Sequence, residues 1–159
     1  MVAVRCRPFN SREKAQNEGK IIAIKDAGYC GIANPHEPDA PPREFSFDYT
    51  YDDDSEQLGI YKNLGAPLLD KAFQGWNGTI FAYGQTGSGK SFSMTGSHDQ
   101  PGIIRQMNEE MFSKIAISQT ATPDLKFLVT CSFMEIYNEV RRTAEPATPA
   151  TPATRDCHT

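Results

Sequence analysis

The sequence predicts an α/β fold built around a strand, a glycine-rich turn and a helix. Three observations lead to this prediction. Residues 78–96, GTIFAYGQTGSGKSFSMTG, contain an apolar strand, closely spaced glycines and the start of a helix. Short segments such as 2–7 and 45–49 alternate apolar with polar residues, which is typical of strands. Segments 58–73 and 103–117 instead space their apolar residues as the buried face of a helix does.

The strands are expected to be short and to be separated by polar loops. They are predicted at residues 2–7, 20–24, 45–49, 79–83 and 124–137. Pro8 ends the first of them, and the four prolines of segment 34–42 indicate a surface loop. The strand at 79–83 leads directly into the glycine-rich turn, and the strand at 124–137 is long and mostly apolar.

Three helices are expected. The first follows an acidic N-cap at residues 52–55, has a kink at Pro67 and ends at Gly75. Its apolar face comprises Leu58, Tyr61, Leu64, Leu68, Leu69 and Phe73. The other two are predicted at 88–94 and 103–117, joined by a polar loop at 95–102.

The C-terminal residues differ in character from the rest. Residues 145–154 repeat proline, alanine and threonine and have no apolar periodicity. Such a segment buries too little side chain to offset the entropy lost on ordering. We therefore predict a folded domain over residues 1–141 and a disordered tail over 142–159.

The composition limits the classes of protein to which this sequence can belong. A chain of 159 residues has the usual size of one domain, and 38% hydrophobic and 23% charged residues suit a soluble globular protein. The formal net charge of −4 lacks the basic excess that attracts nucleic acid or anionic lipid. No apolar run approaches the ~18–20 residues of a membrane span. The four cysteines form no C-x-x-C pair and the three histidines are scattered, which disfavours zinc and favours reduced, cytosolic thiols.

Residues 84–91 carry the most specific chemistry in the sequence. They match the phosphate-loop pattern G-x-x-x-x-G-K-[ST] at every fixed position. The glycines let successive N–H groups point inward at phosphate oxygens, Lys90 adds a positive charge, and the Ser91 hydroxyl is the expected Mg²⁺ ligand. A glycine-rich turn with a chance Lys-Ser pair is disfavoured by the spacing and by the flanking strand and helix. The predicted phosphate-binding residues are Gly84, Gln85, Thr86, Gly87, Ser88, Gly89, Lys90 and Ser91.

Nucleotide hydrolysis would need more than a phosphate loop. It requires an acidic residue that holds Mg²⁺ and a group that positions the attacking water. Glu135 follows an apolar run and is the candidate acid, but we favour a solvent-facing glutamate at the end of its strand.

Several motifs resemble those of kinesin motor domains. Residues 2–13, VAVRCRPFNSRE, resemble the first strand of that family, and FSFDY (45–49) resembles its second. QLGIY (57–61) is similar to its Q-x-x-V-Y pattern, and MEIYNE (134–139) to its L-E-I-Y-N-E. IFAYGQTGSGKS (80–91) is close to diagnostic. The motifs occur in the family's order, cover residues 1–141 and look most like the kinesin-3 subfamily.

The resemblance implies a partial phosphate-loop NTPase fold of the kinesin motor type, with ATP or ADP and Mg²⁺ as ligands. It implies that Arg5, Arg7 and Pro8 lie beside the adenine and that Phe92 lies against its other face. The alternative for Pro8 and Phe92 is a purely structural role in a strand and a core. The resemblance also implies microtubules as partner, a cytoplasmic, cytoskeletal location, and no catalytic role for Glu135.

Family elements missing from the 159 residues limit what is expected of this chain. The two switch motifs, N-x-x-S-S-R-S-H and D-L-A-G-S-E, are absent, so no catalytic residue is assigned and turnover of ATP is not expected. The strands that flank the phosphate-loop strand in the family are absent too, which predicts an incomplete central sheet. Two interpretations stay open: the ATP-binding part of a microtubule motor, or a non-motor product that at most binds nucleotide or a partner. A small phosphate-loop kinase fits less well, because the residues after Ser91 contain no clear lid or substrate pocket.

Overall fold

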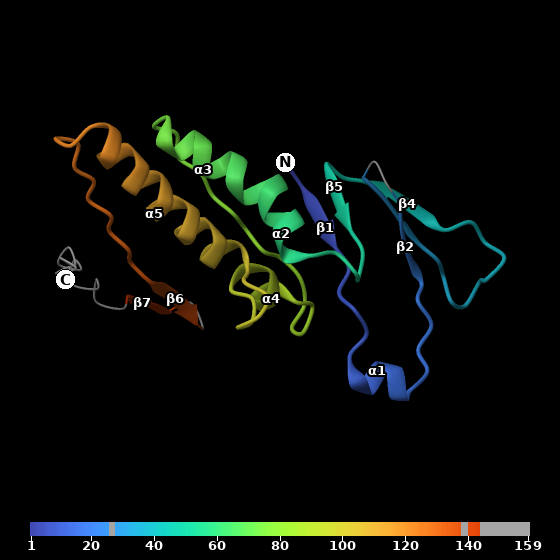
Figure 1. Ribbon diagram of the computed structural model, residues 1–159. Coiled ribbons are helices and arrows are strands. Elements are labelled where there is room, and N and C mark those ends of the chain that lie inside the picture. Colours follow the sequence, from blue (N-terminus) through green and yellow to red (C-terminus); the bar gives the residue numbers. More distant parts are fainter. Residues whose placement is uncertain (26–27, 138–139, 144–159) are drawn as a thin grey trace. The chain divides into compact units, whose positions relative to one another are not determined.

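The computed structural model describes residues 1–25, 28–137 and 140–143 (Figure 1). The chain divides into two compact units, one from Met1 to Ser113 and one that begins at Lys114. The candidate site lies wholly in the first unit. Within the described residues, no helix is long and apolar enough to cross a membrane.

The first unit begins with a parallel strand pair. β1 (Ala3–Arg5) pairs with β5 (Tyr49–Tyr51), so that Ala3 lies opposite Tyr49 (Figure 1). β1 is shorter than the predicted strand at 2–7. The predicted strand at 45–49 is divided between two sheets, because Phe47 and Asp48 separate β5 from β4 (Arg43–Ser46).

A separate antiparallel sheet has the order β2-β3-β4, with β2 at Ile22–Lys25 and β3 at Tyr29–Ile32. β2 confirms the strand expected near 20–24, and the proline-rich segment 34–42 lies outside helices and strands as predicted. β3 was missed, because its central residues Cys30 and Gly31 are not typical of strands. Both are buried, so packing determines this strand rather than local propensity.

One short helix was also missed. α1 (Ser11–Ala15) begins with Asn10, whose side chain accepts a hydrogen bond from the backbone N–H of Glu13. The Glu13 carboxylate in turn accepts from the backbone N–H of Asn10. This reciprocal pair is a capping box, and its N-x-x-E spacing is visible in the sequence.

The long helical run of the first unit has three parts: α2 (Gln57–Ile60), a π-turn η1 (Tyr61–Gly65) and α3 (Ala66–Phe73). The kink expected at Pro67 stays a prediction, and the structure has the π-turn η1 directly before α3. Proline has no N–H to donate, and the Ala66 N–H bonds the Tyr61 carbonyl five residues back. The predicted apolar face is only partly right, since Leu58 and Phe73 are 49% and 41% exposed.

The core of the first unit forms where this run meets α5 (Ile103–Ala121). Ile60, Tyr61 and Ile103 are buried together, and Tyr51, Leu64, Ala66, Ile80 and Met107 pack around them. The Tyr61 hydroxyl donates to the Glu110 carboxylate over 2.7 Å. α5 extends beyond the helix predicted at 103–117, while α4 (Lys90–Met94) begins two residues after the predicted start at Ser88.

The predicted strand at 79–83 is wrong for this structure. The segment has an extended course between α3 and α4 but pairs with no strand among the described residues, and Figure 1 draws it without an arrow. Phe81 and Tyr83 are 82% and 90% exposed, although their rings stack on each other. A strand needs a hydrogen-bonding neighbour, and β1 pairs only with β5. This agrees with the incomplete central sheet that the sequence predicted.

The second unit contains the end of α5 and a hairpin of β6 (Met134–Tyr137) and β7 (Val140–Thr143). The long strand predicted at 124–137 is wrong except for its last four residues. The remainder is exposed, with Leu128 at 84%, because no neighbour pairs with it. Of the tail predicted at 142–159, residues from 144 onward lie outside the described part of the chain.

Candidate functional site

The glycine-rich turn adopts backbone angles that glycine alone tolerates well. Gly84, Gly87 and Gly89 have φ values of 153°, 81° and 95°. A Cβ on Gly84 would lie 2.4 Å from the Ser88 hydroxyl, so a larger residue there would require the Ser88 side chain to shift. The left-handed Gly89 lies directly before α4. The glycine spacing that suggested a phosphate loop therefore has a structural cause.

Lys90 folds back over this loop. Its Nζ donates to the carbonyl oxygens of Gly84 and Gln85, each at 2.8 Å. These bonds hold the ammonium group at the start of the loop. A phosphate group that bound here would compete with the two carbonyls for the same N–H donors. Ser91 follows in the first turn of α4 and is exposed.

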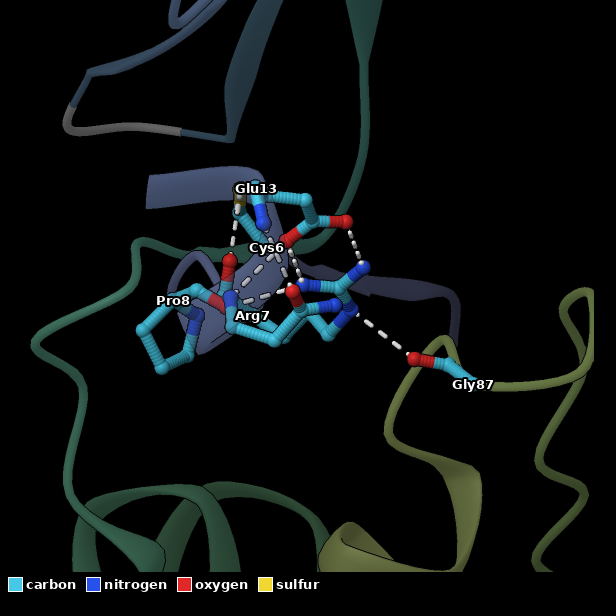
Figure 2. A network of polar contacts seen from close by, with 6 residues as sticks. Cys6, Arg7, Pro8, Glu13 and Gly87 are labelled. Carbon is cyan, nitrogen blue, oxygen red and sulfur yellow. Dashed lines mark hydrogen bonds and ion pairs between the residues drawn. The ribbon is translucent and has the colours of Figure 1, made fainter. Parts of the chain in front are cut away.

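Arg7 connects the loop to the N-terminal segment. Its Nε donates to the Gly87 carbonyl over 2.8 Å, and its two terminal nitrogens bond the two carboxylate oxygens of Glu13 (Figure 2). One of those nitrogens also donates to the Pro8 carbonyl over 2.9 Å. The hydrogen bonds from Arg7, followed by that from the Asn10 backbone, lower the pKa of Glu13 to about 2.

This depressed pKa predicts that the Glu13 carboxylate stays ionised in acid. Its contribution to stability is present above its ordinary pKa of about 4.5 and is lost as the pH falls towards 2. We expect the Glu13 carboxyl ¹³C shift to remain constant from pH 7 down to about 3.5, where an ordinary glutamate is mostly protonated. In Arg7→Met the midpoint should rise, because the first cause of the shift is removed. A midpoint near 4.5 in the unsubstituted chain would contradict the ion pair.

Arg5 has a different environment and a different partner. Its guanidinium lies 5.0 Å from the centre of the Phe92 ring and donates to Gln57 Oε1 at 2.7 Å and to Ser93 Oγ at 2.9 Å. Burial lowers its pKa. The structure thus brings Arg5 and Phe92 together as a cation–π pair, so that one face of the ring is covered by the guanidinium.

Gln57 is the buried polar group that organises this corner. Its Oε1 accepts a hydrogen bond from Arg5, and its Nε2 donates to the Phe92 carbonyl over 2.6 Å. Gln106 donates to the Gln57 carbonyl and to the Pro101 carbonyl. Both glutamines are at least 91% buried, and their hydrogen bonds join α2, α4 and the loop before α5. The sequence indicated Gln57 only as part of a family motif.

A cavity of about 480 Å³ borders the loop within the first unit. Of the predicted site residues, its lining includes Arg5, Arg7, Pro8, Ser88, Gly89, Lys90 and Phe92. The remaining predicted residues, Gly84, Gln85, Thr86, Gly87 and Ser91, are not part of the lining. Along the part of the chain that the structure describes, no group of three or more His, Cys, Asp or Glu residues is arranged to hold a metal. Ser91 thus offers one hydroxyl ligand, and Mg²⁺ bound there would take most of its oxygens from phosphate and water, as it often does in proteins.

Three contributors were not predicted as site residues: Glu13, Gln57 and Gln106. Glu13 had a local signal in the capping-box spacing that begins at Asn10. Gln106 had none, because its partners are 49 and 5 residues away and its position on α5 reads as an ordinary polar residue.

The chain matches the family model described as the kinesin motor domain over residues 5–143. It is 41% identical to kinesin-like protein KIF1A and 42% identical to kinesin-like protein KIF1B, both from Rattus norvegicus, and each match covers 98% of this chain. It covers only 10% and 9% of those two proteins.

Solved structures give the same result. A KIF14 dimer with AMP-PNP in complex with a microtubule superposes with a TM-score of 0.80 and 36% identity, over 89% of this chain and 39% of that one. A KIF14 structure with ADP in complex with a microtubule gives 0.79 and 34%, over 94% and 44% of the two chains. The loop at 84–91, the motifs around it and these matches together show that the chain belongs to the kinesin motor domain family.

Proposed function

We propose that this chain is the ATP-binding part of a kinesin-like microtubule motor. The observation that carries the proposal is the glycine loop itself. Its left-handed glycines and Lys90 adjoin a cavity that Arg7, Pro8 and Phe92 also line. The KIF14 neighbours, of which the chain covers about two-fifths, were solved with AMP-PNP or ADP and in complex with microtubules.

The residues have distinct roles in this proposal. Backbone N–H groups of 84–91 bind the β- and γ-phosphates, and Lys90 exchanges its two loop carbonyls for phosphate oxygens. The Ser91 hydroxyl holds Mg²⁺, which neutralises phosphate charge when it is bound. The adenine lies beside Pro8 and against the face of Phe92 that is turned away from Arg5. A flat base gains stacking energy against such a ring.

The whole-protein activity is proposed from the family. In an intact motor, nucleotide bound at this site would drive movement along microtubules in the cytoplasm, and the partner would be tubulin. No nucleic-acid partner is proposed, in keeping with the net charge of −4.

A non-motor role that stops at nucleotide binding is the second candidate, and one observation favours it. Among the described residues, the lining of the cavity includes no Asp or Glu. Phosphoryl transfer needs an acid to hold Mg²⁺ and a group to position water. Glu135 is exposed in the second unit and is not part of that lining.

The binding of a fluorescent ADP analogue to the monomeric 159-residue chain tests the proposal. We expect saturable binding that is weakened when Mg²⁺ is removed with EDTA, and displacement by ATP. We further expect no microtubule-stimulated phosphate release from these 159 residues alone. No saturable binding at any Mg²⁺ concentration would overturn the site assignment, whereas stimulated release would reject the non-motor candidate.

A further inference from the structure

The Glu13 carboxylate accepts hydrogen bonds both from the start of α1 and from the Arg7 side chain. As a member of the α1 capping box, it accepts from the Asn10 backbone N–H through Oε2 at 2.8 Å. The same carboxylate faces Arg7, with Oε2 2.7 Å from one guanidinium nitrogen and Oε1 paired with the other. The side chains of Arg7 and Glu13 are 32% and 26% exposed, so the pair is partly shielded from water. A carboxylate that is held by a helix start in this way has little freedom to rotate.

The two hydrogen bonds that Arg7 donates to Glu13 determine the orientation of the Arg7 guanidinium. A fork of two parallel N–H···O bonds fixes the plane of the guanidinium group as well as its position. In that plane the Nε–H group points at the Gly87 carbonyl over 2.8 Å (Figure 2). Without Glu13, Arg7 could rotate and lose this alignment.

Gly87 is a part of the phosphate loop that has little support beyond the turn in which the Ser88 N–H donates to the Gln85 carbonyl over 3.1 Å. It is exposed, has a left-handed φ of 81°, and has no atom within 4 Å of the place where a Cβ would lie. Gly89, by contrast, lies close to Arg7 in the N-terminal segment, since a Cβ built on Gly89 would lie 3.7 Å from Arg7 Cβ. The loop therefore lacks side-chain packing at Gly87, and the bond from Arg7 restrains it there.

We propose that Glu13 is a positioning residue for the phosphate loop and acts through Arg7. The pair, which we call the Glu13–Arg7 clamp, holds Gly87 in place before any ligand binds. The consequence for affinity rests on the proposed function, because a pre-ordered loop loses less entropy when it binds phosphate. Arg7 and Glu13 themselves need not touch the nucleotide for this effect.

Hydrogen exchange of the loop amides, measured without nucleotide, tests the clamp directly. Glu13→Gln is the main variant, because glutamine can still close the capping box but cannot form the ion pair. We expect faster exchange over residues 84–91 in Glu13→Gln and unchanged exchange over α1. Asn10→Ala is the matched control, and it should speed exchange in α1 while the loop is unaffected. Loop exchange that is unchanged in both Glu13→Gln and Glu13→Ala would overturn the proposal.

A double-mutant cycle with fluorescent ADP adds a readout that a general loss of stability would not reproduce. We expect Glu13→Gln to weaken binding about 3- to 10-fold, as for a partly exposed charged pair. In an Arg7→Met background the same substitution should have no effect, because its partner is gone. An equal loss in both backgrounds would show that Glu13 acts by another route. If the unsubstituted chain bound no nucleotide but loop exchange responded to Glu13→Gln, the clamp would stand and the proposed function would fail.

Discussion

Lys90→Ala is expected to weaken the binding of fluorescent ADP roughly 30-fold or more. The substitution removes the only side-chain ammonium that donates to the loop carbonyls of Gly84 and Gln85 in the described chain. Loss of a charged hydrogen-bond donor to a phosphate costs about 2 kcal/mol or more, which corresponds to that factor. The measurement is a titration of the monomer, isolated by size exclusion, at a fixed Mg²⁺ concentration.

Lys62→Ala is the matched control for Lys90→Ala. Lys62 is exposed on η1 and is not part of the cavity lining, so its removal changes the net charge equally without altering the candidate site. We expect less than about a 3-fold change, since an exposed charge outside the site is screened by solvent and salt. If Lys90→Ala bound as tightly as the unsubstituted chain, residues 84–91 would not be a phosphate loop in function.

The second large effect concerns stability. We expect calorimetry of the 159-residue chain to show less than half of the ~110 kcal/mol of unfolding enthalpy that a fully cooperative chain of this length would absorb. The reason is the segment 79–83, which has no strand neighbour and exposes Phe81 and Tyr83. Unpaired backbone groups and exposed rings weaken cooperativity and favour association between chains.

A double substitution tests this cause. Phe81→Thr with Tyr83→Thr should reduce concentration-dependent self-association, measured by sedimentation velocity, because it removes two exposed rings without altering the core at Ile60, Tyr61 and Ile103. Leu58→Thr serves as a control, since Leu58 is also exposed but lies on α2. A sharp, fully cooperative transition in the monomeric, unsubstituted chain would contradict the expectation.

Features that depend on neighbouring residues were predictable from the sequence. The glycine spacing of 84–91 implies left-handed backbone at Gly87 and Gly89, and both have it. The helix expected around 57–73 forms because its apolar residues repeat at helical spacing, although the π-turn before Pro67 was not visible. The family motifs likewise pointed to the kinesin motor domain, and the family match confirms this.

Features that depend on distant partners were not predictable. The strand propensity of 79–83 and 124–133 was real, but a strand forms only where another backbone supplies hydrogen bonds. β3 was missed for the opposite reason, since its neighbours β2 and β4 stabilise a segment of weak propensity.

The sequence by itself determined the glycine-rich turn at 84–91, because that turn depends on the backbone freedom of its glycines. It also determined the family, through short motifs that occur in the order typical of kinesin motor domains. Only the tertiary structure decided the surroundings of the loop. Arg7 reaches Gly87 across 80 residues of sequence, and Arg5 reaches Ser93 across 88. Such pairs arise from folding of the chain as a whole, and no local pattern encodes them.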